Sequence, residues 1–420
     1  MTWFKEKEIA SITSEDDRYR LFTILNSFFV HITQEETTFA AAVANNMLIG
    51  AGYSILENSE FWDEILMRNM QIIREEISRN KLGREAFPDP ALIDTAYSVY
   101  FVWKNTKYFG KFVNSFNGYI EDVTSNYIQY FYENKQNLGY GFFSLFSGLS
   151  GICNYLLEFG DEYQTMIEEL LRIFVYITNE ESAGSSRIMN QVDLTNNSLD
   201  FSLSNGIGGI LMVMVKAYTN NIVVPEQEQA MNQIIRTYRR YVIRRNNSTY
   251  WPGILHFGSQ NDFQESGNMK ETWAYGALAI SRVLHAAGNS IHNADIVEWT
   301  NQIMLSKGRM PSNEFIVMTP SLSNGYSGLL SLFDAVYRDD PSIVFYKAKN
   351  NLLKKIMEFY TDKPEPTFKL KEIILASDRI TEVVTLGNNT ISHGNIGILL
   401  SLVSAFSTAT PLFYRYIGIS

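Results

Sequence analysis

The stretch TPSLSNGYSGLL, Thr319–Leu330, contains the pattern that decides the fold. Two glycines three residues apart, Gly325 and Gly328, open an apolar run, and two small polar residues, Ser323 and Asn324, stand directly before them. Glycine has no β-carbon, so it allows close approach of neighbouring backbone where a chain enters a buried helix. The stretch therefore predicts a tight turn followed by an inner helix.

The same template recurs along the chain. Four of its five copies have glycine in the second and fifth positions, and Ala279 takes the place of the later glycine in the remaining copy. The copies are SGLSGICNYLL from Ser147, NGIGGILMVMV from Asn205, YGALAISRVLH from Tyr275, NGYSGLLSLFD from Asn324 and HGNIGILLSLV from His393. A weaker sixth copy, TAYSVYFVWKN from Thr95, lacks the glycines. Such internal repetition is the signature of a repeat architecture.

The segments between the turns predict what each repeat contains. The runs after the glycines are apolar nearly all round, which suits helices buried on most faces. Amphipathic stretches alternate with them, such as PEQEQAMNQIIRTYRRYVIRR from Pro225, with the proline expected at the first helical position, and DPSIVFYKAKNNLLKKIMEFY from Asp340. Successive first glycines are 58, 70, 49 and 69 residues apart, which leaves room for one outer and one inner helix.

This alternation predicts an all-α fold, an α/α toroid whose inner ring is wrapped by an outer ring. The glycine turns are then expected at one end of the inner ring, around a shared cavity. An open solenoid is the alternative, but the inner helices are too apolar to line an exposed concave face. We expect a single domain, 1–420, with an N-terminal helical part, 1–90, and motif-bearing repeats, 91–405. The stretch 361–390 breaks the period and predicts a long loop with room for short strands.

Composition narrows the function classes. The net charge of −10 argues against nucleic-acid binding, which needs clustered Lys and Arg. No apolar run approaches the ~18–20 residues of a membrane span, and the first residues do not resemble a secretory signal. The single cysteine, Cys153, excludes an intrachain disulfide and is expected to be a buried thiol. We therefore expect a cytoplasmic protein without a membrane span.

The turns also carry a family resemblance. Together with WAYG at Trp273–Gly276, LSNG at Leu322–Gly325 and WP at Trp251–Pro252, they resemble the lanthionine synthetase C-like proteins, the lantibiotic cyclases, over roughly residues 90–405. The resemblance implies an α/α toroid with a central zinc held by a Cys in a W-C-Y-G motif and by adjacent Cys and His in a C-H-G motif. In that family the zinc activates a substrate thiol for addition to a dehydroamino acid, and a nearby His, Asp and Arg assist proton transfer.

Carried over position by position, this pattern meets replaced residues. The zinc-ligand positions fall on Ala274, Ser323 and Asn324. The assisting histidine, arginine and aspartate fall on Asn205, Lys270 and Ser144, whereas Trp273, Tyr275 and the glycines remain. Zinc needs sulfur, imidazole or carboxylate donors, which Ala, Ser and Asn do not supply. The resemblance thus implies a degenerate member, a pseudo-cyclase without zinc or another cofactor.

Seven residues are candidates for lining the cavity or binding a peptide. They are Asn205, His256, Lys270, Trp273, Tyr275, Asn324 and His393. For the two asparagines, the alternative is that they only satisfy backbone groups in the turns. For His393 the alternative is a capping histidine, and His31, His285 and His292 are expected to be structural or exposed. A glycoside hydrolase is disfavoured because the motif turns carry no Asp or Glu, although Glu271 follows Lys270.

Three functions remain open. The first is a non-catalytic binding or assembly component of lanthipeptide biosynthesis that engages a precursor peptide, a dehydratase or an active cyclase. The second is a metal-independent cyclase that joins cysteine thiols to dehydroamino acids by proximity alone. The third is a regulatory or immunity protein that captures the finished peptide.

Overall fold

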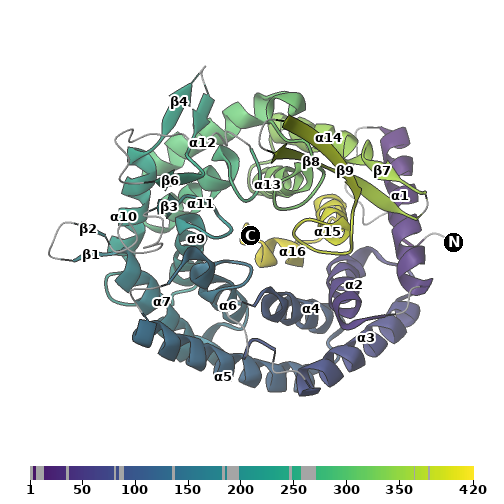
Figure 1. The fold of residues 1–420 in the computed structure, drawn as a ribbon, viewed down its shortest axis with the longest axis horizontal. Helices are drawn as coiled ribbons and strands as arrows, with labels where there is room; N and C mark the ends of the chain where they lie inside the picture. Colours follow the sequence, from purple (N-terminus) through teal and green to yellow (C-terminus); the bar gives the residue numbers. More distant parts are fainter. Residues whose placement is uncertain are drawn as a thin grey trace.

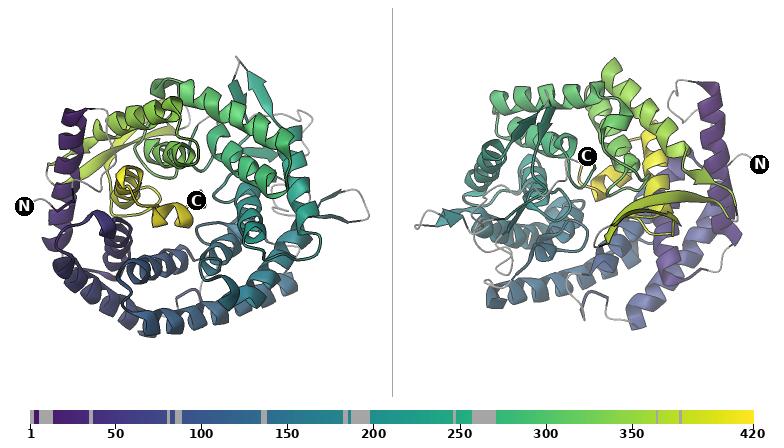
Figure 2. Two further views of the ribbon diagram at one scale, coloured as in Figure 1. Left: turned by 180° about the vertical axis from the view of Figure 1, so that it is seen from behind. Right: turned by 45° about the horizontal axis from the view of Figure 1, so that its top comes forward.

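A computed structural model shows a closed double ring of helices (Figure 1). It describes residues 3–5, 14–34, 37–79, 82–84, 89–134, 138–181, 185–186, 198–245, 248–256, 271–363, 365–376 and 379–420. The view from behind and the tilted view show the same closed ring (Figure 2). The predicted α/α toroid is confirmed, and the alternative prediction of an open solenoid is wrong.

The inner ring consists of strongly apolar helices. In α15, for example, every residue from Asn395 to Phe406 is buried, which explains why this segment has no polar face. The inner helices are α2 (Phe39–Gly52), α4 (Pro90–Thr106), α6 (Leu149–Leu156), α9 (Ile207–Thr219), α11 (Ala277–Ser290), α13 (Tyr326–Asp339) and α15 (Asn395–Phe406). The weak sixth copy of the repeat is confirmed as the inner helix α4, and α2 is an inner helix that the repeat did not predict.

The outer ring consists of amphipathic helices. These are α1 (Glu15–Gln34), α3 (Ser59–Arg79), α5 (Gly110–Asn134), α7 (Gln164–Thr178), α10 (Gln227–Arg240), α12 (Ala294–Arg309) and α14 (Ile343–Met357). The outer ring closes where α1 meets α14, and there Arg20 Nη2 donates to the Met357 carbonyl at 2.9 Å. The expected start of α10 at Pro225 is wrong, because Glu226 adopts a left-handed conformation (φ 64°) and the helix begins after it.

The motif glycines are required by close contact between backbones. A β-carbon at Gly328 would lie 2.6 Å from Trp273 Cβ and closer still to the Leu322 carbonyl oxygen. The second glycine of four turns faces the carbonyl oxygen of the residue six positions earlier in the same way. These pairs are Gly151 with Leu145, Gly209 with Leu203, Gly328 with Leu322, and Gly397 with Ile391. The repeat is therefore a packing requirement at the entry of each inner helix.

Backbone hydrogen bonds join each glycine turn to the next around one end of the ring. The donors and acceptors are Leu145 N to Ser204 O (2.8 Å), Leu203 N to Ala274 O (2.9 Å), Ala274 N to Ser323 O (3.1 Å) and Ser323 N to Ser392 O (2.9 Å). This chain of bonds confirms that the five turns gather at one end. It also fixes the relative positions of the residues just before the glycines.

Short antiparallel sheets decorate the ring. They pair β1 (Glu180–Glu181) with β2 (Ser185–Ser186), β3 (Ser198–Asp200) with β6 (Ile254–His256), β4 (Ile243–Arg245) with β5 (Ser248–Tyr250), and β8 (Thr367–Ala376) with both β7 (Tyr360–Thr361) and β9 (Arg379–Leu386). The stretch 361–390 is thus mainly a long β-hairpin rather than a loop. Its strands pair in register from Lys369 opposite Leu386 to Ala376 opposite Arg379.

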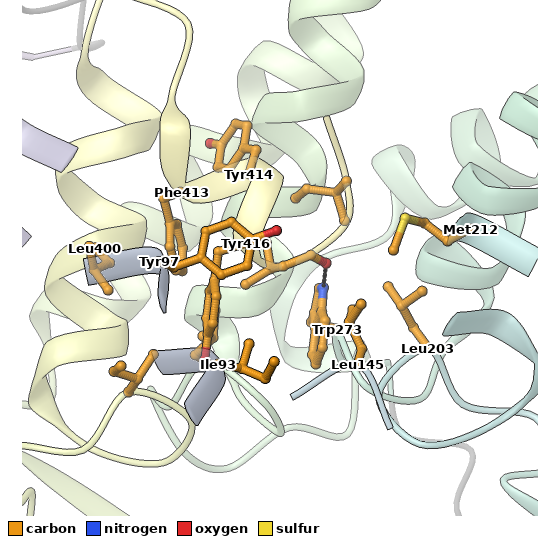
Figure 3. Close-up of a cluster of buried hydrophobic side chains, with 14 of the residues drawn as sticks. Ile93, Tyr97, Leu145, Leu203, Met212, Trp273, Leu400, Phe413, Tyr414 and Tyr416 are labelled. Atoms are coloured by element: carbon orange, nitrogen blue, oxygen red, sulfur yellow. Dashed lines mark hydrogen bonds between the residues drawn. The ribbon is translucent and has the colours of Figure 1, made fainter. Parts of the chain in front are cut away.

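The C-terminal segment occupies the centre of the ring (Figure 1). Short helix α16 (Leu412–Tyr416) packs its aromatic side chains against the inner helices, and Tyr416 lies 5.2 Å from Tyr97 between ring centroids (Figure 3). Trp273 Nε1 donates to the Ile417 carbonyl at 3.1 Å, and Arg282 Nε donates to the Ile419 carbonyl at 2.8 Å. These contacts fix the end of the chain inside the toroid.

A buried ionic cluster ties the C-terminal segment to the inner ring. The fully buried Asp334 carboxylate accepts hydrogen bonds from Lys349 Nζ at 2.5 Å, Arg338 Nε at 2.6 Å and Tyr414 Oη at 2.7 Å. A buried charge needs such partners, because an unpaired one is strongly destabilising.

Across the described ranges, none of the helices has the length and hydropathy needed to cross a bilayer.

Candidate functional site

A cavity of about 420 Å³ opens at the glycine-turn end of the ring. Four of the five turns contribute to its wall, with Phe146, Asn205, Ser323 and His393 among the lining residues. The remaining side is formed by the N-terminal parts of α2 and α4, and Tyr416 of the C-terminal segment also lines it. The expectation of a shared cavity at this end is therefore confirmed. Its volume lies in the usual range for small-ligand sites, about 300–1,000 Å³.

The three positions to which the resemblance assigns the zinc ligands lie in adjoining turns. Ala274 is buried and uses its backbone N–H and carbonyl to connect the turns on either side. Ser323 is buried and lines the cavity. Asn324 is exposed, and its Nδ2 lies 3.3 Å from His393 Nε2. The three positions therefore adjoin in the fold, but they offer a methyl, a hydroxyl and an amide in place of metal donors.

His393 is the imidazole of this cavity. Besides the contact with Asn324, its Nδ1 lies 2.8 Å from Ser392 Oγ, so both ring nitrogens have polar partners. Within the described part of the chain, no three His, Cys, Asp or Glu side chains are grouped so that they could hold a metal ion. The residues at the family's zinc position therefore do not fit a tetrahedral zinc site.

Asn205 lies at the cavity wall, and a different residue caps its turn. The Ser202 hydroxyl accepts hydrogen bonds from the backbone N–H groups of Asn205 and Gly206, both at 3.1 Å. The Asn205 amide is therefore not needed by the turn and contributes to the cavity lining. Ser144, to which the resemblance assigns the assisting aspartate, is buried, and its hydroxyl accepts a hydrogen bond from Phe146 N at 3.1 Å.

Two aromatic candidates lie away from the cavity lining. Trp273 is fully buried within the cluster of apolar side chains in Figure 3, so its place among the cavity candidates is wrong. Its ring packs on Phe146 with centroids 4.8 Å apart. Tyr275 is partly buried, and its hydroxyl faces Asp200 Oδ2 at 3.5 Å. Burial, reinforced by the Asp200 carboxylate, raises the pKa of Tyr275 to about 12. Burial also raises the pKa of Asp200, an acid that the repeat pattern did not single out.

Sequence reasoning also missed Asp94. This residue lies on the cavity-facing part of α4 and lines the cavity, and its Oδ1 accepts a hydrogen bond from Tyr416 Oη at 2.7 Å. Burial raises the pKa of Asp94 from its ordinary value to about 7, although the Tyr416 hydrogen bond acts in the opposite direction. The sequence signal was weak, since α4 lacks the glycines that mark the other inner helices.

The remaining candidates fall partly outside the described residues. Lys270 lies outside them, and for His256 the structure gives only its backbone position at the end of β6, opposite Ser198. Glu271, which follows Lys270, is buried and pairs with the buried Lys307 at 2.5 Å. Glu271 is therefore part of a structural ion pair, consistent with the argument against a glycoside hydrolase.

The other histidines and the cysteine have structural surroundings. His31 Nε2 lies 3.5 Å from Glu365, His285 Nδ1 lies 3.2 Å from Thr300 Oγ1, and His292 occupies a left-handed turn (φ 56°). Cys153 is fully buried, as expected, and burial raises the pKa of its thiol. Two of these histidines, His285 and His292, line a second cavity of about 890 Å³ at the opposite ends of the inner helices.

Comparison with known proteins is consistent with this geometry. The family model of the lanthionine synthetase C-like proteins matches residues 93–372, about two thirds of the chain. The chain belongs to the lanthionine synthetase C-like family. It is 21% identical over 344 residues to the nisin biosynthesis protein NisC of Lactococcus lactis subsp. lactis, covering 78% of this chain and 81% of that protein. The solved structure of a nisin cyclase superposes with a TM-score of 0.74 at 17% identity, covering 97% of this chain and 98% of that one.

The matched range of this lanthionine synthetase C-like protein includes Ala274, Ser323 and Asn324, the positions to which the resemblance assigns the zinc ligands. His393 and its turn lie beyond residue 372, although they complete the cavity wall. A structural likeness at 17% identity speaks for the fold, and the chemistry must be argued from the side chains present.

Proposed function

We propose that this lanthionine synthetase C-like protein is a non-catalytic component of lanthipeptide maturation that binds a precursor peptide in the cavity at its glycine-turn end. The observation that carries the proposal is the side-chain set in adjoining turns. Ala274, Ser323 and Asn324 supply no thiolate or imidazole, while the backbone bonds that hold these turns together remain. The fold of a cyclase is kept without the donors that would activate a thiol through zinc.

The cavity lining suits peptide binding. Asn205 and Ser323 offer an amide and a hydroxyl, which bond peptide groups in either direction because they both donate and accept. Phe39 and Phe146 provide apolar wall for a side chain. Since the relatives are a nisin biosynthesis protein and a nisin cyclase, a ribosomally made precursor peptide is the class of ligand that we infer.

A binding experiment tests the proposal. A fluorescently labelled lanthipeptide precursor, unmodified or dehydrated, is titrated with wild-type protein and with Asn205→Trp, which fills the cavity from its wall. We expect binding of the leader-bearing precursor and at least tenfold loss in the variant. His292→Trp is the matched control, because it adds the same side chain in the second cavity. Equal binding by all three proteins, or no binding of any precursor, would refute the proposal.

Metal analysis tests the non-catalytic part. We expect no stoichiometric zinc in purified wild-type protein. The triple variant Ala274→Cys, Ser323→Cys and Asn324→His should acquire one zinc per chain, because the backbone bonds between turns already hold residues 274 and 323 in adjoining positions. Stoichiometric zinc bound by the wild type through residues of the cavity would contradict the proposal.

A second candidate function is metal-independent cyclisation. The observation that favours it is the presence of two groups able to transfer protons, His393 and Asp94, in the lining of one cavity. Mass spectrometry of free thiols in a dehydrated precursor decides the matter. A rate above buffer that is lost in His393→Gln would support cyclisation over simple binding, whereas a rate equal to buffer would exclude it for that precursor.

A further inference from the structure

The cavity at the glycine-turn end contains one carboxylate without a cation. Asp94 Oδ1 accepts from Tyr416 Oη at 2.7 Å, and across the described part of the chain no donor bonds the second carboxylate oxygen. The described residues that line the cavity include neither lysine nor arginine. Asp94 is half-buried, and an acid in such surroundings lacks the opposite charge that normally accompanies a carboxylate withdrawn from water.

The groups around Asp94 have other partners or carry no positive charge. Asp89, on the same helix, is itself an acid and caps the helix by accepting from Ala91 N at 2.9 Å. The inner helices packed on α4, namely α2 and α6, carry no charged residue. Arg415, next to Tyr416 in the chain, turns away to the Glu158 carboxylate at 2.5 Å. His393 is the other group in the lining whose residue type changes charge near neutral pH.

The walls next to this carboxylate are aromatic. Tyr416 supplies the hydrogen bond to Asp94, and its ring lies 5.4 Å from Phe146 between centroids. Phe39 lines the same cavity from the start of α2. Aromatic faces attract cations through the ring quadrupole, and the attraction is stronger when water is excluded. A carboxylate in a cavity with aromatic residues in its lining is therefore suited to an ammonium group carried on an aliphatic stem.

We propose that Asp94 is the recognition group for a positively charged side chain, a lysine ammonium, of the bound peptide. This inference rests on the proposed function, which makes the ligand a peptide, and it assigns the chemistry of one of its side chains. The ammonium donates to the free oxygen of Asp94, while its methylene stem covers Phe39 and Phe146. Tyr416 positions the carboxylate from the centre of the ring.

The proposal predicts a specific pH dependence. Burial without a cation raises the pKa of Asp94 to about 7, so the empty cavity holds a neutral acid below that pH. Only the ionised form attracts an ammonium, so binding of the ammonium should weaken by roughly tenfold for each pH unit below 7 until the pKa of the complex is reached. A ligand carbonyl that accepts from the protonated acid would show the opposite trend.

Small probes separate this proposal from the proposed function. The probe is N-acetyl-lysine N-methylamide, and its neutral counterpart is N-acetyl-norleucine N-methylamide, both followed by ligand-observed NMR between pH 5 and pH 8. At pH 8 we expect a preference of about tenfold or more for the lysine probe, the ratio that a charge-assisted hydrogen bond provides. At pH 5 the preference should fall below about twofold.

Two variants assign the effect. Asp94→Asn keeps an oxygen acceptor for Tyr416 and should abolish the lysine preference. Asp339→Asn is the matched control, because it removes a carboxylate from the second cavity and should have no effect.

Each contrary outcome has a distinct meaning. Equal binding of lysine and norleucine probes at pH 8, or a lysine preference that persists in Asp94→Asn, would overturn the assignment. Tighter binding of either probe at pH 5 would show that Asp94 acts as a protonated donor, which also overturns it. If the lysine probe binds as predicted while no precursor peptide binds, the cation site stands and the proposed function fails. If the precursor binds without a lysine preference, only the cation site fails.

Discussion

The glycine turns can be tested by a single methyl group at Gly328. A β-carbon there would lie 2.6 Å from Trp273 Cβ, whereas carbon atoms normally pack 3.5–4.0 Å apart, so the inner helix or the buried Trp273 must move by about 1 Å. The Leu322 carbonyl oxygen would lie closer still to this β-carbon. Overpacking of a rigid core costs about 1–3 kcal/mol. Because the obstacle here includes backbone, we expect Gly328→Ala to lower the free energy of unfolding by about 3 kcal/mol.

Gly118 supplies the matched control for this substitution. It lies inside the outer helix α5, and a β-carbon there would meet nothing within 4 Å. Gly118→Ala should therefore stabilise the protein by about 0.5–1 kcal/mol, the usual gain inside a helix. Urea denaturation followed by circular dichroism measures both variants, and a melting curve should shift down by roughly 3 °C for Gly328→Ala. A Gly328→Ala protein as stable as Gly118→Ala would refute the packing explanation of the repeat.

Three further predictions concern buried ionisable groups. Asp334→Ala should lower the free energy of unfolding, measured by urea denaturation, by about 3–5 kcal/mol because it leaves the Lys349 charge buried without its acid. In the control Asp339→Ala, the carboxylate that is removed is 68% exposed, so the loss should be no more than about 1 kcal/mol. Cys153 should resist a thiol reagent in the folded protein, since burial raises its pKa, and should react fully in urea; rapid reaction under native conditions would contradict its burial. Asp94→Asn should leave stability nearly unchanged at pH 4 and raise it by about 4 kcal/mol at pH 8, since each unit of the difference between a pKa of 3.8 and one of about 7 is worth ~1.4 kcal/mol. A folded pKa of about 7 means that the folded state holds a proton that the unfolded state loses between pH 4 and 7, so wild-type stability falls with rising pH across that window; parallel curves for variant and wild type would refute this.

Much of the fold could be predicted from the sequence, because each glycine turn leaves no room for a β-carbon and so shows glycine at the same positions. Each second glycine of four turns faces a carbonyl oxygen, so the pattern survives wherever an inner helix is entered in this way. Helix α2 was missed because its entry is different. It begins after Thr38, whose side chain accepts from Ala41 N, and no pair of glycines precedes it. The hairpin at 367–386 was underestimated because a sheet on the surface of a helical ring adds no repeat of its own.

The site was predictable only where it coincides with the turns. Asn205, Ser323 and His393 line the cavity because each stands just before a motif glycine or one position further ahead. The role of Asp94 could not be predicted, because it follows from a contact between segments that are far apart in the chain: Tyr416 of the C-terminal helix donates a hydrogen bond to it. Trp273 was placed in the cavity because it belongs to a glycine turn. Its indole instead lies in the core, where Nε1 donates a hydrogen bond to the Ile417 carbonyl.

The arrangement of each turn explains how chemistry can be lost while the fold is kept. At the fourth turn, the backbone N–H and carbonyl of Ser323 bond the turns on either side, and Gly328 packs against backbone and the buried Trp273. The side chain of Ser323 takes part in neither task and lines the cavity. A change of the side chain at position 323 therefore removes no contact that closes the ring. The atoms that close the ring and the atoms that line the cavity are different atoms of the same residues, so the ligand of the cavity can change on an unchanged toroid.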